Sequence, residues 1–213
     1  MISAGLKQKF LNYLLAGQHQ QCSSVIRELL NDNTSFILIY EDLLKHSLYE
    51  VGFLWERNKI GVAEEHLASA IIEKLLSEIY PSIENVQPVN KNAIVCCIEK
   101  EHHQIGSKMV ADIFEKNGWE TLYLGANTPE SSLIRYIELT HPQFLALSLS
   151  IYFHFHSFKI LLDKLTTKFP ELNICIGGQA FNHIPESQIP ESQRIKFFKD
   201  LHEIDLYLRT SAK

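Results

Sequence analysis

The spacing of apolar residues changes once along this chain, between Pro81 and Lys91, and this change constrains the fold most strongly. Before it, apolar residues recur at steps of three, four or one, which is the spacing of one face of an α-helix. After it, short apolar runs alternate with helical patterns, as in units where helices connect parallel strands. We therefore expect a helical domain over residues 1–82, a linker from Pro81 to Pro88, and an α/β domain over residues 90–213.

The N-terminal half contains four amphipathic segments joined by short connections, which predicts a four-helix bundle. The fourth segment runs from about Val62 to Tyr80. Gly61 occupies the position of its N-cap, and Glu64 lies in the first turn, where a negative charge complements the helix dipole. The apolar positions that define the segments are Phe10, Tyr13, Leu14 and Leu15; Val25, Leu29 and Leu30; Phe36, Ile39, Leu43, Leu44, Leu48 and Val51; and Leu67, Ala70, Ile71, Leu75 and Leu76.

The C-terminal half alternates strand and helix patterns at a spacing that indicates parallel strands with right-handed crossovers. This predicts a flavodoxin-like, Rossmann-type open sheet, in which ligands bind beyond the carboxyl ends of the strands. The segment Ile204–Leu208 fits either a fifth strand or the last helix. Strands are predicted at Ala93–Ile98, Thr121–Leu124, Phe144–Leu149 and Ile174–Ile176, and helices at about Gln104–Asn117, Glu130–Thr140 and Phe158–Lys168.

The loop after the first predicted strand reads Glu101-His102-His103-Gln104-Ile105-Gly106. An acid two residues before a histidine can accept the proton of one ring nitrogen, which leaves the other nitrogen to bind a metal. A glycine three residues after the histidine lets a bulky group pass close to the backbone. The pattern predicts His103 as a metal ligand supported by Glu101 and Gly106, and the spacing of His102 does not fit it.

Small and polar residues follow the other predicted strands, and we expect them at the same edge of the sheet as His103. A channel of small residues with one hydrogen-bond donor can accept an elongated group inserted into an α/β domain. These candidates are Asn127 and Thr128 after the second strand, Ser148, Ser150 and Tyr152 at the third, and Gly177 and Gly178 after the fourth.

Other ionisable residues have less specific patterns. His154 and His156 alternate in an aromatic segment, which fits a second metal-binding pair or, as we prefer, the solvated start of a loop. Asp112 and Glu115 fit exposed charges on a helix.

Composition excludes several classes of protein. A net charge of -5 and a pI near 6.1 argue against direct nucleic-acid binding, because phosphate contacts need clustered Lys and Arg. No run of 18 apolar residues and no secretory signal pattern are present, so we expect no membrane span. The cysteines have no metal-type spacing, and reduced core thiols predict a cytoplasmic protein. They are Cys22, Cys96, Cys97 and Cys175.

The order acid-x-His-x-x-Gly at Glu101, His103 and Gly106 resembles the signature of cobalamin (vitamin B12)-binding domains. The resemblance implies that His103 is the lower axial ligand of the cobalt and that Glu101 sets its tautomer. Most members of this group carry aspartate in the first position. A glutamate, as here, is similar to the light-sensing and regulatory branch of the family.

A second signature lies in the helical half, where Trp55 is followed after nine residues by Glu65 and His66. This arrangement resembles the helical cap of cobalamin-dependent photoreceptor repressors. It implies that Trp55, Glu65 and His66 bind the cofactor from above. Some photoreceptors carry a histidine beside the tryptophan, whereas this chain has Glu56 there, a departure that concerns part of the light response.

The remaining candidates match the family in part. The segment Leu124–Pro129 resembles its second loop, and Ser148 has the place of the serine that hydrogen-bonds the displaced dimethylbenzimidazole. Gly177 and Gly178 correspond to the glycine pair beside the nucleotide tail. Ser150 stands where leucine is usual, which implies a differently shaped tail pocket.

Three functions are compatible with this resemblance. The first is a light- or ligand-sensing regulator that holds adenosylcobalamin, or another cobalamin form, between cap and sheet. The second is a methyl-carrying corrinoid protein of a methyltransferase system, and the third is a binder of another tetrapyrrole. We favour the first, since a glutamate suits the ribose hydroxyl of an adenosyl group better than a methyl group.

The resembling repressors carry a MerR-type DNA-binding domain, which has no counterpart before Ser35. We therefore expect a stand-alone sensor without an enzymatic activity or catalytic residues of its own. Its output would pass through a partner transcription regulator or through self-association into a homo-oligomer.

Overall fold

The computed structural model describes residues 1–83 and 87–211, and it forms two compact units, Met1–Glu84 and Asn85–Lys213. Part of the predicted linker, residues 84–86, lies outside the described residues. Each unit is considered separately below.

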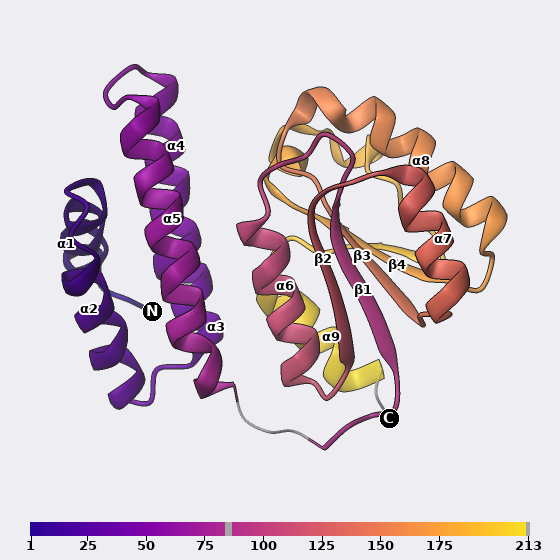
Figure 1. Ribbon diagram of the computed structural model, residues 1–213, viewed down its shortest axis with the longest axis horizontal. Helices are drawn as coiled ribbons and strands as arrows, with labels where there is room; N and C mark the ends of the chain where they lie inside the picture. Colours follow the sequence, from indigo (N-terminus) through magenta and orange to yellow (C-terminus); the bar gives the residue numbers. More distant parts are fainter. Residues whose placement is uncertain (84–86, 212–213) are drawn as a thin grey trace. The chain divides into compact units, whose positions relative to one another are not determined.

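The first unit is a bundle of helices (Figure 1). A π-helical segment, Tyr40–Lys45, joins α3 to α4, so that residues 36–56 form one continuous helical rod. Among the described residues the bundle therefore has four rods, and the predicted helical domain architecture is confirmed. The elements are α1 (Ala4–Leu15), α2 (His19–Asn31), α3 (Phe36–Ile39), α4 (His46–Glu56) and α5 (Val62–Ile79), followed by a 3-10 turn, Tyr80–Ser82.

The core of the first unit is apolar and comes from all four rods. Phe10 and Leu14 of α1 are fully buried, as are Tyr40 and Leu75 from the later rods. Burial of side chains of this size is the main favourable contribution to folding. Gly61 is the N-cap of α5, as predicted, and its backbone N–H donates to the Glu64 carboxylate over 3.0 Å.

The second unit contains a parallel five-stranded sheet in the order β2-β1-β3-β4-β5. This is the flavodoxin-like order, and it confirms the predicted fold class. The strands are β1 (Asn92–Ile98), β2 (Glu120–Thr128), β3 (Phe144–Ser148), β4 (Asn173–Gly177) and β5 (Ile195–Phe197).

In the described part of this unit, four helices cover the sheet, and α7 and α8 lie on the opposite face from α6 and α9 (Figure 1). The segment Ile204–Leu208 belongs to α9, where Ile204 and Leu208 are buried four residues apart on one side of the helix. The fifth strand is instead β5, which the apolar pattern does not predict because Lys196 separates its two apolar residues. The helices are α6 (Ile105–Lys116), α7 (Glu130–Thr140), α8 (Phe155–Lys168) and α9 (Leu201–Ser211).

One prediction about helix charges is wrong. Asp112, expected on the surface of α6, is completely buried and forms an ion pair with Lys108 one turn earlier. Glu115 is partly exposed.

The four cysteines are free and buried in this structure. Within the described ranges, no helix is both long enough and apolar enough to cross a bilayer.

Because all strands are parallel, their carboxyl ends meet at one edge of the sheet. Pairing in register brings Cys97 of β1 beside Ser148 of β3, and Ser148 beside Gly177 of β4. The loops that follow these strands therefore assemble around the end of β1, which leads directly to Glu101.

Candidate functional site: a buried carboxylate that orients an exposed imidazole

Glu101 is buried at the carboxyl edge of the sheet, and both of its carboxylate oxygens accept hydrogen bonds. Oε1 accepts from the backbone N–H of His103 over 3.0 Å and lies 2.6 Å from its ring Nδ1. Oε2 accepts from the backbone N–H groups of Ser150 and Ile151, each over 2.9 Å. One carboxylate thus joins the loop after β1 to the loop after β3.

These hydrogen bonds decide the charge of Glu101. Burial by itself raises the pKa of this carboxyl group, because it disfavours the charged form. The hydrogen bonds from the His103 ring and from the three backbone N–H groups act against burial and lower the pKa to about 2. Glu101 is therefore ionised at neutral pH and acts only as an acceptor.

The charge of Glu101 determines the tautomer of His103. An ionised carboxylate cannot donate, so the proton between the two groups belongs to Nδ1, and in the neutral imidazole the lone pair is on Nε2. The side chain of His103 is 59% exposed, whereas that of Glu101 is fully buried. The ring is thus held at one nitrogen by the protein while it extends into solvent. His102 is exposed as well, but no described contact orients its ring toward an acid.

The reasons for having a glycine differ between positions at this edge of the sheet. Gly178 has φ +116°, and a Cβ placed on it would lie 2.3 Å from the carbonyl oxygen of Leu149, so the chain's own packing requires glycine there. A Cβ on Gly177 would lie 2.9 Å from the carbonyl oxygen of Phe198. At Gly106, in the first turn of α6, no described atom lies within 4 Å of that position apart from its chain neighbours and the backbone of its own helix. A glycine in a helix costs about 1 kcal/mol relative to alanine, and protein packing gives no reason for it here.

The other predicted site residues fall into two groups. Ser148, Ser150, Gly177 and Gly178 are brought to the same edge by the pairing of β3 with β4 and by the contact with Glu101. In the second group, Asn127 and Thr128 reach this edge at the end of β2, where Thr128 pairs with Ile98 of β1. Asn127 and Tyr152 are exposed, whereas Thr128 is buried.

Trp55, Glu65 and His66 belong to the first unit. Trp55 lies at the end of α4 and is 46% exposed, which is high for a tryptophan. Glu65 lies in the first turn of α5, where its carboxylate accepts from the Ser69 hydroxyl over 3.0 Å and lies 3.6 Å from His66 Nε2. The indole of Trp55 is therefore not part of the apolar core of the first unit.

The secondary structure argues against the alternative metal pair. His154 ends a 3-10 turn and His156 lies in α8, so the two residues are not on a strand where alternate side chains share a face. Side chains two residues apart on a helix point in different directions.

Sequence patterns did not reveal several contacts beneath the loop. The Cys97 thiol lies 3.2 Å from the Ser107 hydroxyl, which donates to the carbonyl of Gln104 over 2.8 Å. Tyr123 also donates to that carbonyl, over 3.2 Å. Burial raises the pKa of Cys97 to about 11, so this thiol is protonated at neutral pH. No sequence signal marks these residues, because their contacts join three separate segments.

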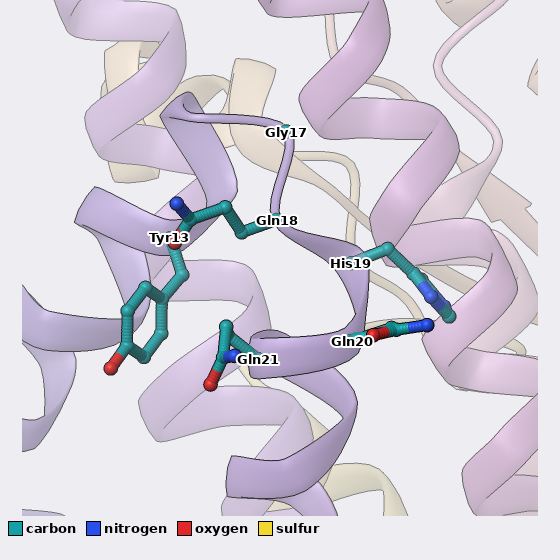
Figure 2. A pocket seen from close by; sticks show the side chains of 6 residues that line it. All are labelled: Tyr13, Gly17, Gln18, His19, Gln20 and Gln21. Atoms are coloured by element: carbon teal, nitrogen blue, oxygen red, sulfur yellow. The ribbon is translucent and has the colours of Figure 1, made fainter.

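A different concavity lies at the turn between α1 and α2 (Figure 2). There the side chains of Tyr13 and His19 extend to different sides of the turn, and neither belongs to a predicted site. His19 is instead held by Glu78, whose carboxylate lies 3.0 Å from its Nε2. The concavity is lined by Tyr13, Gly17, Gln18, His19, Gln20 and Gln21. We do not assign the candidate site there.

The donor set restricts the kind of metal that His103 could bind. Among the residues that the structure describes, no cluster of three or more His, Cys, Asp or Glu side chains could enclose a metal ion. Protein sites for bare Zn²⁺ use three or four such ligands. A single oriented imidazole suits a metal that arrives with its other ligands, as in a macrocyclic cofactor.

Comparison with protein-family models agrees with this chemistry. A B12 binding domain model matches residues 91–192, and a second B12 binding domain model matches residues 6–80. The two matches fall in different units of the structure and together span most of the chain.

Two curated relatives are transcriptional repressors of Myxococcus xanthus. The HTH-type transcriptional repressor CarA is 32% identical over 90 residues, which are 42% of this chain and 31% of the repressor. The HTH-type transcriptional repressor CarH is 26% identical over 144 residues, 66% of this chain and 47% of the repressor. The chain therefore spans less than half the length of either curated relative.

Two solved structures from Methanosarcina barkeri share the fold. The monomethylamine corrinoid protein superposes with a TM-score of 0.81 at 16% identity, covering 95% of this chain and 96% of that chain. The methanol:cobalamin methyltransferase complex MtaBC gives a TM-score of 0.51 at 13% identity, covering 99% and 81%. At these identities the likeness concerns the fold alone.

Proposed function

We propose, from the membership of this chain in the family of B12-binding domain proteins, that it is a cobalamin-dependent regulatory sensor. Its cofactor is cobalamin, and we propose His103 as the lower axial ligand. The observation that supports this assignment is the pair of ionised Glu101 and exposed His103, joined over 2.6 Å. The pair fixes one imidazole tautomer before any ligand binds.

The residues of the second unit have separate roles in this proposal. Glu101 keeps the His103 ring in place and raises its basicity as a ligand. The open position above the Gly106 backbone admits a bulky group near the first turn of α6. Ser148, Ser150, Tyr152, Asn127 and Thr128, with Gly177 and Gly178, are proposed to surround the nucleotide tail.

The regulatory part of the proposal rests on the first unit and on the curated relatives. Both relatives are named as repressors, and their identity to this chain exceeds that of the solved corrinoid structures. We propose that Trp55, Glu65 and His66 contact an adenosyl upper ligand. Adenosylcobalamin supplies a cobalt–carbon bond that light can break. Loss of its upper ligand would release Trp55 and Glu65 and change what the protein associates with, a partner regulator or a second copy of itself.

Absorption spectra test the cofactor assignment. Purified protein should bind adenosylcobalamin in darkness and show the spectrum of a histidine-ligated cobalt. Green light should change this spectrum, and size-exclusion chromatography should show a different molecular mass after illumination. The hydroxo form, treated in the same way, serves as the control and should not respond.

The upper-ligand assignment has a matched control on the same helix. Trp55→Ala should reduce the preference for adenosylcobalamin over the hydroxo form. Phe53 is equally exposed, at 46%, and lies two residues away, so it points in another direction. Phe53→Ala should therefore leave this preference unchanged. An equal loss of affinity for both cobalamin forms in Trp55→Ala would make Trp55 a packing residue only.

A methyl-carrying corrinoid function is the second candidate. It is supported by the shared fold, since the monomethylamine corrinoid protein superposes with a TM-score of 0.81 over 95% of this chain. In that case a methyltransferase would be the partner. Identical size-exclusion profiles before and after light, together with methyl transfer in the presence of such an enzyme, would establish this function and contradict the sensor.

A further inference from the structure

Two residues next to the candidate site have left-handed backbone conformations. Lys100, directly before Glu101, has φ 70°, and Asn127, at the end of β2, has φ 50°. Asparagine tolerates this region because its short polar side chain forms local hydrogen bonds, whereas lysine has no such advantage. The conformation of Lys100 therefore needs support from its surroundings.

Asn127 supplies that support through two hydrogen bonds. Its side-chain Oδ1 accepts from the backbone N–H of Lys100 over 2.8 Å, and its own backbone N–H donates to the carbonyl oxygen of Glu101 over 2.8 Å. The two bonds lie on either side of the peptide that joins Lys100 to Glu101. They hold the turn from which the Glu101 side chain leaves the backbone.

We infer that Asn127 is a positioning residue for His103, acting through the backbone of Lys100 and Glu101. The inference rests on the proposed role of His103 as the ligand. It gives Asn127 a positioning function in addition to its proposed place beside the nucleotide tail, since its side-chain oxygen is already engaged within the protein.

The chain of contacts has three steps. Asn127 fixes the Lys100–Glu101 turn, the turn places the carboxylate among the N–H groups of Ser150 and Ile151, and the carboxylate orients the His103 ring. A change at the first step should therefore appear as a change in the tautomer of His103. An effect on loop stability alone would not alter which ring nitrogen carries the proton.

The test uses two substitutions that separate the side chain from the backbone. Asn127→Gly keeps the left-handed conformation and the backbone N–H, and deletes the Oδ1 acceptor. Asn127→Asp keeps an acceptor oxygen in the same place. The matched control is Asn90→Gly, because Asn90 has φ 53°, precedes β1 and lies in the same unit.

Nitrogen-15 NMR of the cofactor-free protein, at alkaline pH, provides a measurement that does not involve cobalamin. Wild type, Asn127→Asp and Asn90→Gly should show His103 protonated mainly at Nδ1. Asn127→Gly should shift the tautomer ratio toward Nε2–H about fivefold, the size expected when one hydrogen bond is lost. An unchanged ratio in Asn127→Gly would overturn the inference.

Spectra of the cobalamin-bound proteins provide the second measurement. Asn127→Gly should lower the ratio of histidine-ligated to histidine-free cobalt by a similar factor, and Asn127→Asp should restore it. If the wild type lacks histidine ligation, the proposed ligand is wrong, while the NMR ratio still decides the role of Asn127. If Asn127→Gly does not fold, a shift in Asn127→Asp relative to Asn90→Gly would overturn the inference.

Discussion

Glu101 and Asp205 are both buried carboxylates of the second unit, and they differ in what they hold. Asp205 lies on α9, where Oδ1 accepts from Lys116 over 2.8 Å and from the Asn117 amide over 2.9 Å, and Oδ2 from Arg209 over 2.8 Å. Burial would raise the pKa of Asp205, but these hydrogen bonds and the charges of Lys116 and Arg209 lower it. The pKa of Glu101 is lowered too, by neutral N–H donors and an imidazole.

The comparison shows that a shifted pKa does not by itself identify a functional site. Asp205 has two cationic partners that compensate its charge, and its bonds join α6 to α9 as a structural anchor. Glu101 has no Lys or Arg among its described partners, and it holds an exposed imidazole. Its negative charge is thus available to stabilise positive charge on His103 or on a metal bound there.

The largest expected effect is that of removing the imidazole. His103→Ala should abolish the spectrum of histidine-ligated cobalamin and weaken binding strongly, because no other described residue occupies its place. His102→Ala, the neighbouring histidine, should leave the spectrum unchanged. A histidine-ligated spectrum in His103→Ala would remove the basis for treating Glu101 as the functional carboxylate.

The second prediction compares the two acids directly. Glu101→Gln replaces an acceptor by an amide whose NH₂ group faces backbone donors, so cobalamin affinity should fall about 10- to 100-fold. Asp205→Asn should leave the affinity within about twofold of wild type, since its partners do not touch the candidate site. Isothermal titration with cobalamin measures both values. Equal losses in the two variants would mean that Glu101 acts only on stability.

The third prediction concerns acid stability. The folded pKa of Glu101, about 2, is below its ordinary value of 4.5, so its stabilising contribution is complete above pH 4.5 and is lost as the pH falls toward 2. Urea unfolding of Glu101→Gln should therefore show a smaller decrease in the free energy of unfolding over this range. Asp205→Asn should flatten the curve in the same direction, because the pKa of Asp205 is also lowered. A curve for Glu101→Gln that is parallel to wild type would contradict the assigned charge.

The smallest effect is expected from weakening the ion pair between Lys116 and Asp205, which joins α6 to α9. Lys116→Met removes one cation from Asp205 while Asn117 and Arg209 remain. Asp205 is buried but keeps two partners, so we expect a loss of about 1.5 kcal/mol in the free energy of unfolding and no change in the cobalamin spectrum. Denaturant titration gives the first value. A spectral change in this variant would show that α6 transmits strain from its C-terminus to His103.

Most of the secondary structure could be predicted because it depends on local periodicity. The helical rods of the first unit, the change of period, and the strands β1 to β4 follow from the spacing of apolar residues. The apolar pattern does not predict β5, because Lys196 separates its two apolar residues, and it fits both a strand and a helix at Ile204–Leu208. Asp112 was placed on the surface because its burial depends on packing around α6.

The candidate site also has one part that could be predicted from local sequence and another that depends on the tertiary structure. Glu101 and His103 are two residues apart, so their contact is local, and the sequence by itself determined both the pair and the fold class that carries it. Only the tertiary structure decided that Ser150, Ile151 and Asn127 would serve this pair, because they lie 26 to 50 residues after Glu101 in the chain. The ionised state of Glu101 also belongs to the folded protein, since it results from donors on separate loops that meet only when parallel strands align their carboxyl ends.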